Sequence, residues 1–266
     1  MANYAELQKL EPPEQQRQLA ALLYWDHLPP EPDRVPVGLE AFLKAAPITN
    51  RAAALAVYWQ AREQAACVQV LSQQSDRIEE LVPPVLELRE HPEGPNAMLR
   101  LQAARLAVQA DLLDAKGALF ASQAELMRWS PAGKSQNWWW PETQPQSGGY
   151  PTEFTNVQQW ERSSRLHQRL ALRLPAWEEA LANHAAAVID ADAARAIHAQ
   201  AFAADPLALD GLLAAWEAQT AQTRAFLAAL THFNVAVAAY ALAVLPPETS
   251  SELLAVALLR GPAAAL

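Results

Sequence analysis

Apolar residues recur at steps of three, four and seven along four long segments of the chain, which is the spacing of helices that pack along one side. The segments run from Asn50 to about Pro83, from Asn96 to Trp129, from about Ser163 to Ala204 and from Asp205 to Leu245. Representative stripe residues, in the same order, are Leu71 and Ile78, Leu112 and Leu119, Leu174 and Leu181, and Leu230 and Val237. The pattern predicts four long helices.

Prolines predict where the first of these helices ends. Pro83 and Pro84 should end or kink the first helix, because each removes a backbone donor and clashes with the preceding turn. A weaker helical pattern continues to Glu90, and residues 91–95 then form a turn. The first two helices are therefore expected to fold back on each other.

Capping residues give a second set of boundaries. Asn50 is expected to cap the first long helix, and Asp205 followed by Pro206 is typical of an N-cap and a first helical residue. Ser250 is one of two serines expected to cap a short last helix. Pro175 should bend the third helix near its start.

Less regular segments flank the helices. Residues 1–49 contain seven prolines and two short helical patterns, over 14–25 and 38–45, and are expected to form an N-terminal arm. Residues 130–162 lose the helical texture and predict a long linker, and residues 250–260 predict the short final helix.

These elements predict an all-α fold. The helical domain, residues 50–266, is expected to be an elongated antiparallel bundle of two coiled-coil-like hairpins, over 50–129 and 163–245. Arms of about forty residues would each extend about 60 Å at 1.5 Å per residue.

The charge balance excludes one class of partner. The chain has 20 basic and 29 acidic side chains and a net charge of −9, which is the wrong sign for a protein that grips phosphate backbones. We expect no nucleic-acid partner.

Cys67 is the single cysteine of the 266 residues, so no internal disulfide is expected, and its apolar neighbours predict an inert, packed thiol.

Two segments of the chain bear on export and membrane insertion. The first stretch carries Glu6, Lys9 and Arg17, so no secretory signal is expected in it. The uncharged window Ala225–Leu245 is 21 residues long and could just cross a hydrocarbon layer. Its centre is polar, with Asn234 among other hydrogen-bonding side chains, so a buried helix is favoured over a membrane span.

Motifs that carry catalysis or bind metals are missing from the sequence. A di-metal helical bundle needs a Glu three residues before a His, and none of the six histidines has one there. The sequence lacks GxSxG, HExxH and GxxxxGK[ST] motifs. The sequence therefore predicts no enzyme, no metal and no cofactor.

Two groups of residues are candidates for binding. Trp138, Trp139 and Trp140 could stack on a sugar, hold a lipid headgroup or mark a membrane interface, or else fix the linker to the helices by burying aromatic surface. A polar seam or tunnel is the second candidate, formed by Thr220, Thr223 and Asn234, although a structural hydrogen bond from Asn234 to nearby backbone is equally compatible.

The last long helix also carries a family resemblance. Its segment 212–247 contains Ala218-Gln219, Phe226, Phe233-Asn234 and Tyr240, and in this order it resembles the closing helix of TolC-type outer-membrane efflux proteins. The Ala- and Leu-rich segment 99–126 is similar to that family's repeated helix, and Tyr58-Trp59 suits the helix before it. The run 148–154, GGYPTEF, resembles a linker between the helix pairs of shortened members.

The resemblance implies a shortened, barrel-less member of that family. Such a protein is non-catalytic, assembles laterally through its helical hairpins as a homo-oligomer, and docks a periplasmic or inner-membrane export component. Its tips would lie at residues 91–95 and 202–206, which makes His91, Glu93 and Asp205 candidate docking residues. The implied location is the cell envelope. The alternative is a soluble, cytoplasmic helical scaffold or interaction protein that has lost transport.

Overall fold

The computed structural model describes residues 4–24, 34–129, 138–152 and 165–264. Four long helices dominate it, and the predicted all-α character is confirmed. They are α4 (Arg51–Glu79), α6 (Gly94–Met127), α8 (Arg165–Ala204) and α9 (Leu209–Val244). Two predicted boundaries lie outside the described residues: the start of the third long helix at Ser163, and Trp25, the end of the short helical pattern over 14–25.

The first hairpin turns at two short helices. α4 ends at Glu79, and the proline pair lies in the first turn of α5 (Val82–Glu87), where a missing backbone donor costs little. The 3₁₀ helix η2 (Leu88–Glu90) follows. The next helix, α6, begins at Gly94 rather than at the predicted Asn96, because Pro95 is accepted in its first turn. A Cβ on Gly94 would lie 1.9 Å from the carbonyl oxygen of Leu88, so only glycine fits this turn.

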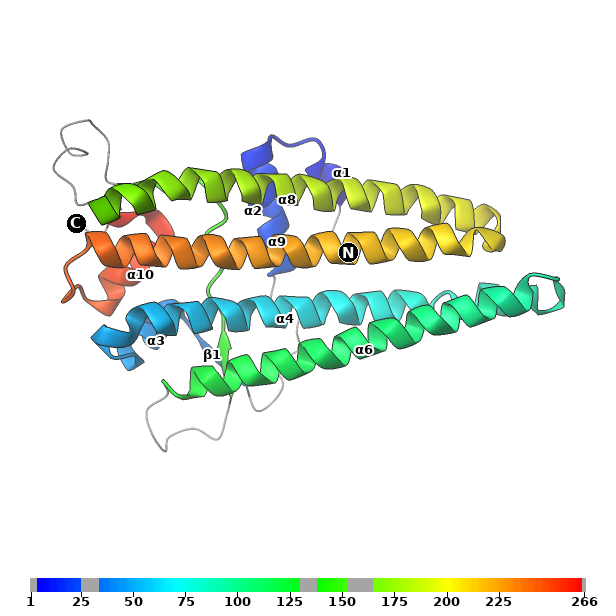
Figure 1. Ribbon diagram of the computed structural model, residues 1–266, viewed down its shortest axis with the longest axis horizontal. Helices are drawn as coiled ribbons and strands as arrows, with labels where there is room; N and C mark the ends of the chain where they lie inside the picture. The colour runs from blue at the N-terminus through cyan, green and yellow to red at the C-terminus, as the bar shows by residue number, and fades with distance from the viewer. Residues whose placement is uncertain (1–3, 25–33, 130–137, 153–164, 265–266) are drawn as a thin grey trace.

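Capping is as predicted at two of three helix starts. The Asp205 carboxylate accepts a 2.9 Å hydrogen bond from the backbone nitrogen of Leu207 at the start of η3 (Pro206–Ala208). The Ser250 hydroxyl accepts from Leu253 at 3.2 Å at the start of α10 (Ser251–Arg260). Asn50 occupies the cap position of α4, but its side chain makes no capping bond. α8 runs unbroken through Pro175 and is curved in Figure 1.

The long helices lie side by side in the order α8, α9, α4, α6 (Figure 1). Each hairpin packs internally, α4 on α6 and α8 on α9, and the two hairpins join where α4 packs on α9. The helices therefore form a row whose edges are α6 and α8. Both hairpin tips lie at one end of this row, and we call the opposite end the base (Figure 1).

The second half of the arm, the linker and the C-terminal helix form the base, whereas the first two helices of the arm lie against the middle of the row (Figure 1). In the arm, α1 (Tyr4–Leu7) and α2 (Pro12–Leu23) pack on α8, and α3 (Leu39–Ala45) packs on α10. The sequence did not predict the two parallel strands, β1 (Arg34–Val37) in the arm and β2 (Trp138–Pro141) in the linker, in which Val35 lies opposite Trp139. Two 3₁₀ helices complete the base, η1 (Ile48–Asn50) and η4 (Pro262–Ala264).

The core continues from base to tip. The base contains the largest cluster of buried residues, with Phe42, Tyr58 and Phe233 fully inaccessible. A second cluster lies near the tips, where Ile78, Leu101, Phe202 and Leu212 share one interior. Among the described residues, one helical stretch, Pro206–Val244, is long and apolar enough to cross a membrane, and half of its most apolar window is buried by the rest of the chain.

Candidate functional site

The structure brings the two predicted docking tips together. Glu93, from the first predicted tip, and Leu207, one residue beyond the second, line the same small depression of about 90 Å³. Arg100 of α6 forms an ion pair with Asp210 of α9 across it. The hairpins therefore present one composite tip surface.

The candidate tip residues are exposed and polar. Nδ1 of His91 accepts a 3.2 Å hydrogen bond from the backbone nitrogen of Glu93, and the Glu93 carboxylate accepts from Asn96 at 3.4 Å. The Asp205 side chain caps its own turn. These contacts order the turns and leave the side chains on the surface, where a partner could reach them.

The three candidate residues of the polar seam lie in three different surroundings. Thr220 lines a groove between α6 and α9. Thr223 is buried and donates to the backbone oxygen of Gln219 in its own helix at 2.8 Å. Asn234 faces the linker. The structure does not bring these three side chains together.

Asn234 is 2% exposed and holds the linker backbone in two directions. Its Oδ1 accepts from the backbone nitrogen of Gln146 at 2.8 Å, and its Nδ2 donates to the carbonyl oxygen of the same residue at 2.8 Å. Nδ2 also donates to the carbonyl oxygen of Leu230 in α9. The amide thus replaces the pairing that a neighbouring strand would give the linker.

A short polar network lies between α8 and α9. Gln219 of α9 donates from Nε2 to the buried carboxylate of Asp192 in α8 at 2.8 Å. Arg195, one turn along α8, donates to the same carboxylate oxygen at 3.0 Å. The buried carboxylate of Asp192 therefore accepts hydrogen bonds from both helices, and the network joins α8 to α9 through polar atoms.

The groove that contains Thr220 has a volume of about 550 Å³. Its floor includes Ile78 of α4 and Trp216 of α9, and its rim carries Asp111 and Arg224, whose charged groups are 3.7 Å apart. Trp216 is buried, and its Nε1 has no hydrogen-bond partner. The groove is a mixed surface with charges at the rim and apolar side chains below.

The linker tryptophans pack on three different parts of the protein. Trp139 is buried and meets Phe42 of the arm edge to face at 6.0 Å between ring centroids. Trp138 is half-buried beside Phe120 of α6, with centroids 5.0 Å apart. Trp140, also half-buried, packs on the small cluster between α4 and α6. Trp138 and Trp140 keep part of their surface accessible.

Two polar side chains of α4 hold the arm and the linker at once. The Tyr58 hydroxyl donates to the carbonyl oxygen of Val37 at 2.9 Å and accepts from the backbone nitrogen of Thr143 at 3.1 Å. Arg62 donates to the carbonyl oxygen of Tyr24 at 2.8 Å, and its guanidinium lies 5.4 Å from the centre of the Tyr24 ring. Sequence patterns do not reveal these roles, because the partners are backbone atoms of distant segments.

The glycine-containing linker motif also packs on the base. Gly148 and Gly149 have φ values of 126° and 66°, which glycine adopts easily. Tyr150 then enters the core, where its hydroxyl donates to the carbonyl oxygen of Ala257 at 2.8 Å and its ring meets Tyr240 edge to face. The motif therefore joins the linker to α10 and α9.

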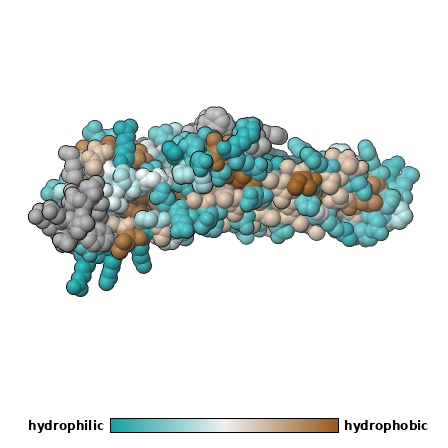
Figure 2. Space-filling model, turned by 90° about the horizontal axis from the view of Figure 1, so that it is seen from above, coloured by the Kyte–Doolittle hydropathy of each residue, from teal (hydrophilic) through white to brown (hydrophobic). Residues whose placement is uncertain are grey.

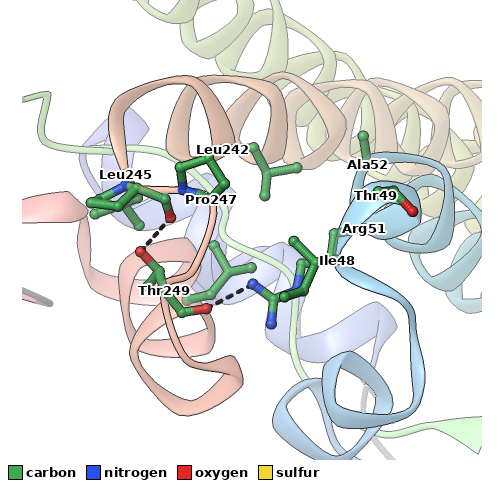
Figure 3. A pocket seen from close by; sticks show the side chains of 10 residues that line it. Ile48, Thr49, Arg51, Ala52, Leu242, Leu245, Pro247 and Thr249 are labelled. Carbon is green, nitrogen blue, oxygen red and sulfur yellow. Dashed lines mark hydrogen bonds between the residues drawn. The ribbon is translucent and has the colours of Figure 1, made fainter.

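A pocket of about 170 Å³ lies at the base between η1, the end of α9 and the start of α10 (Figure 3). Arg51, 6% exposed, lines it and donates to the carbonyl oxygen of Thr249 at 2.7 Å and to the Ser251 hydroxyl at 3.3 Å. The other lining groups are largely apolar, as Leu242 and Pro247 are. Arg51 acts here as a clamp on the turn that leads into α10.

Burial perturbs titratable side chains of α4, and Glu63 and Cys67 are among them. Burial raises the pKa of the Glu63 carboxyl above its usual value, against an opposing hydrogen bond from Thr231. Burial, together with the charge of Glu63, raises the pKa of the Cys67 thiol to about 11. Neither group lines the pockets described above. Within the described part of the chain, no three His, Cys, Asp or Glu side chains are placed to hold a metal ion.

The outer face of α6 is an apolar surface that the sequence analysis did not identify. Four large side chains at steps of seven are exposed by more than half: Leu99 (65%), Leu106 (58%), Leu113 (69%) and Phe120 (60%). Exposed small residues lie between them at Ala103, Ala110, Gly117 and Ala124. We call these eight residues the outer seam.

The opposite edge of the row has no such pattern. The exposed large apolar residues of α8 are Leu166, Leu172, Trp177 and Ile197, at unequal intervals. Figure 2, which views the molecule from the side of α8, shows small brown areas separated by hydrophilic atoms. The row therefore has one apolar edge and one mixed edge.

Comparison with known proteins gives no further assignment: no family model, no curated protein and no solved structure matches the chain.

Proposed function

We propose that the protein is a non-catalytic helical assembly protein, related to the TolC-type efflux and export machinery that its sequence resembles. It acts by packing its helices against other helices and by docking a partner at its composite tip. The observation that carries the proposal is the outer seam. One face of α6 packs in the core and a second apolar face is exposed to solvent, and exposed apolar surfaces of this kind mark sites of interaction with another protein.

The arrangement of the helices supports this role. Laterally assembling helical proteins need hairpins that lie side by side and leave an edge free, and the row α8, α9, α4, α6 has that form. Both tips lie at one end, so one partner can contact both hairpins. The partner that the resemblance suggests is a periplasmic or inner-membrane export component, and the location that it suggests is the cell envelope.

The buried polar residues support a non-catalytic role. Three of these side chains form hydrogen bonds with backbone atoms of the arm and linker: Tyr58, Arg62 and Asn234. Such contacts fasten the arm and the linker to the long helices. The alternative, a soluble scaffold without a transport role, shares these clamps and differs in its assembly.

Light-scattering mass of the full chain, with and without detergent, tests the proposal. We expect a mass that is a multiple of 29.1 kDa, or recovery of the protein in a membrane fraction that detergent disperses into such a species. A mass of 29.1 kDa in both solutions and no membrane-associated protein would contradict it and favour the soluble scaffold.

A further inference from the structure

The outer seam alternates large and small residues at every step. Leu99 is followed by Ala103, Leu106 by Ala110, Leu113 by Gly117, and Phe120 by Ala124, at intervals of four and three residues. This is a heptad pattern sustained over 26 residues, or about 38 Å of helix. The other face of α6, with Leu101, Val108 and Leu119, already packs in the core.

The alternation determines which arrangement of two such helices packs without gaps. In a parallel pair, like positions face each other, so layers of two leucines would alternate with layers of two alanines. In an antiparallel pair, the large residue of one helix faces the small residue of the other, and facing layers interdigitate. The seam is therefore complementary to itself only when one copy is reversed.

We propose that the outer seam is the interface with a second copy of this chain, paired antiparallel about a two-fold axis near residues 111 and 112. In this register, each of the eight layers joins one large and one small residue, and small residues let the helices approach closely. Four layers are Leu99 with Ala124, Ala103 with Phe120, Leu106 with Gly117, and Ala110 with Leu113, the second residue of each pair belonging to the second copy, and symmetry repeats them.

The residues flanking the seam suit the same register. Asp114 would lie opposite Ala107 of the second copy, and Arg100 opposite Ala121. Lys116 would lie opposite Gln109, an uncharged amide. No like charges oppose each other along this interface, although the chain as a whole carries a net charge of −9.

The competing pairing, of α6 with the α8 edge of a neighbour, lacks a matching surface. The exposed apolar residues Leu172 and Ile197 of α8 lie on one stripe, but 25 positions separate them. The same stripe carries the exposed polar residues Glu179, Asn183 and Asp190 between them. Near the C-terminal end of α6, Trp138 packs against Phe120 with the two rings tilted, which widens the apolar surface beyond the seam itself. The pairing deepens the proposed function, on whose assembling role it rests, by naming the partner and the geometry.

Cysteine cross-linking of the full chain tests the register. In a Cys67→Ala background, Leu99→Cys and Ala124→Cys are made on separate chains, one carrying a tag, and treated with a short bis-maleimide. We expect cross-linked dimers when the two variants are mixed and none with either alone, because like positions would lie about 38 Å apart. Cross-linking of Leu99→Cys to itself, or no cross-link in the mixture, would overturn the antiparallel register.

Charged seam variants separate this pairing from assembly in general. Leu106→Glu with Leu113→Glu should reduce the cross-link yield at least 10-fold without changing helicity, because both side chains are exposed in the single chain. Leu172→Glu, at an equally exposed leucine on α8, is the matched control and should have no effect. Assemblies that persist unchanged in the double variant would remove the pairing and leave the proposed function standing. A wild-type monomer at every concentration, with and without detergent, and no membrane-associated protein would remove both.

Discussion

Asn234 of α9 and Gln146 of the linker are joined by two hydrogen bonds of 2.8 Å, in which one side-chain amide both accepts from and donates to one residue's backbone. The side chain of Gln146 takes no part in these bonds. The contact shows one role of a buried polar residue in a long helix: Asn234 holds part of the irregular linker.

Asn234→Ala tests this role directly. The substitution leaves a partly buried backbone nitrogen and carbonyl of the linker without these partners, so we expect a loss of about 2–4 kcal/mol in the free energy of unfolding, measured with urea. Gln146→Ala, which keeps both backbone bonds, is the control and should cost less than about 0.5 kcal/mol. Equal losses in the two variants would show that the amide bonds contribute nothing.

Arg62→Met should release the arm from α4. The arginine donates to the carbonyl oxygen of Tyr24 at the end of α2, and methionine keeps the apolar stem without the donors. We expect faster cleavage in the arm by limited proteolysis. Arg105→Met removes an exposed ion pair with Glu79 and should change the cleavage pattern little, since such pairs contribute about 0–1 kcal/mol.

Two glycines should respond with opposite signs to replacement by alanine. Gly148 has a φ of 126°, and a Cβ there would lie 1.9 Å from Nε2 of Gln16, so Gly148→Ala should destabilise the fold by about 1–3 kcal/mol. Gly117 lies inside α6 with open space around it, so Gly117→Ala should stabilise by about 0.5–1 kcal/mol. Chemical denaturation of both variants at low protein concentration measures the difference.

The raised pKa of Glu63 predicts a pH dependence. A carboxyl whose pKa is higher in the folded than in the unfolded chain adds stability at low pH and loses it as the pH rises through the folded value. Glu63→Gln should therefore raise the melting temperature at pH 7–8, and its advantage should shrink toward pH 4. Glu217→Gln, on the exposed face of α9, should leave the melting temperature unchanged at both ends of this range.

Cys67 should react slowly in the folded protein. The thiol is 5% exposed and its pKa is raised to about 11, so the thiolate fraction at pH 8 is roughly 100-fold or more below that of a free cysteine. Labelling with Ellman's reagent, followed with and without denaturant, measures the ratio. Complete labelling of the native protein within minutes would refute this environment for Cys67.

Much of the fold could be predicted from local signals. The four long helices and the caps at Asp205 and Ser250 follow from heptad spacing and capping chemistry, which depend on neighbours in the sequence. The pairing of β1 with β2 could not, because Val35 and Trp139 are 104 positions apart and neither strand has alternating polarity. The clamps of Tyr58 and Arg62 were missed for a similar reason, since their acceptors are backbone oxygens.

The outer seam is different, because its signal was present in the sequence. Leu99 and Leu106 begin a heptad that is two positions out of step with Leu101 and Val108, and two positions correspond to about 200° around a helix. The two stripes lie on nearly opposite faces of the helix. A prediction of a single apolar face therefore describes the buried stripe and leaves the outer seam out. The candidate tips, by contrast, were predicted as separate turns, and only the structure shows them as one surface.

Sedimentation equilibrium of the full chain, over a range of concentrations, tests the central claim that the protein works by helical assembly through α6. We predict twice the chain mass of 29.1 kDa for the wild type, and 29.1 kDa with unchanged helicity for the double variant Leu106→Glu, Leu113→Glu. A wild type that remains at 29.1 kDa at the highest concentration, or a double variant as heavy as the wild type, would contradict the account.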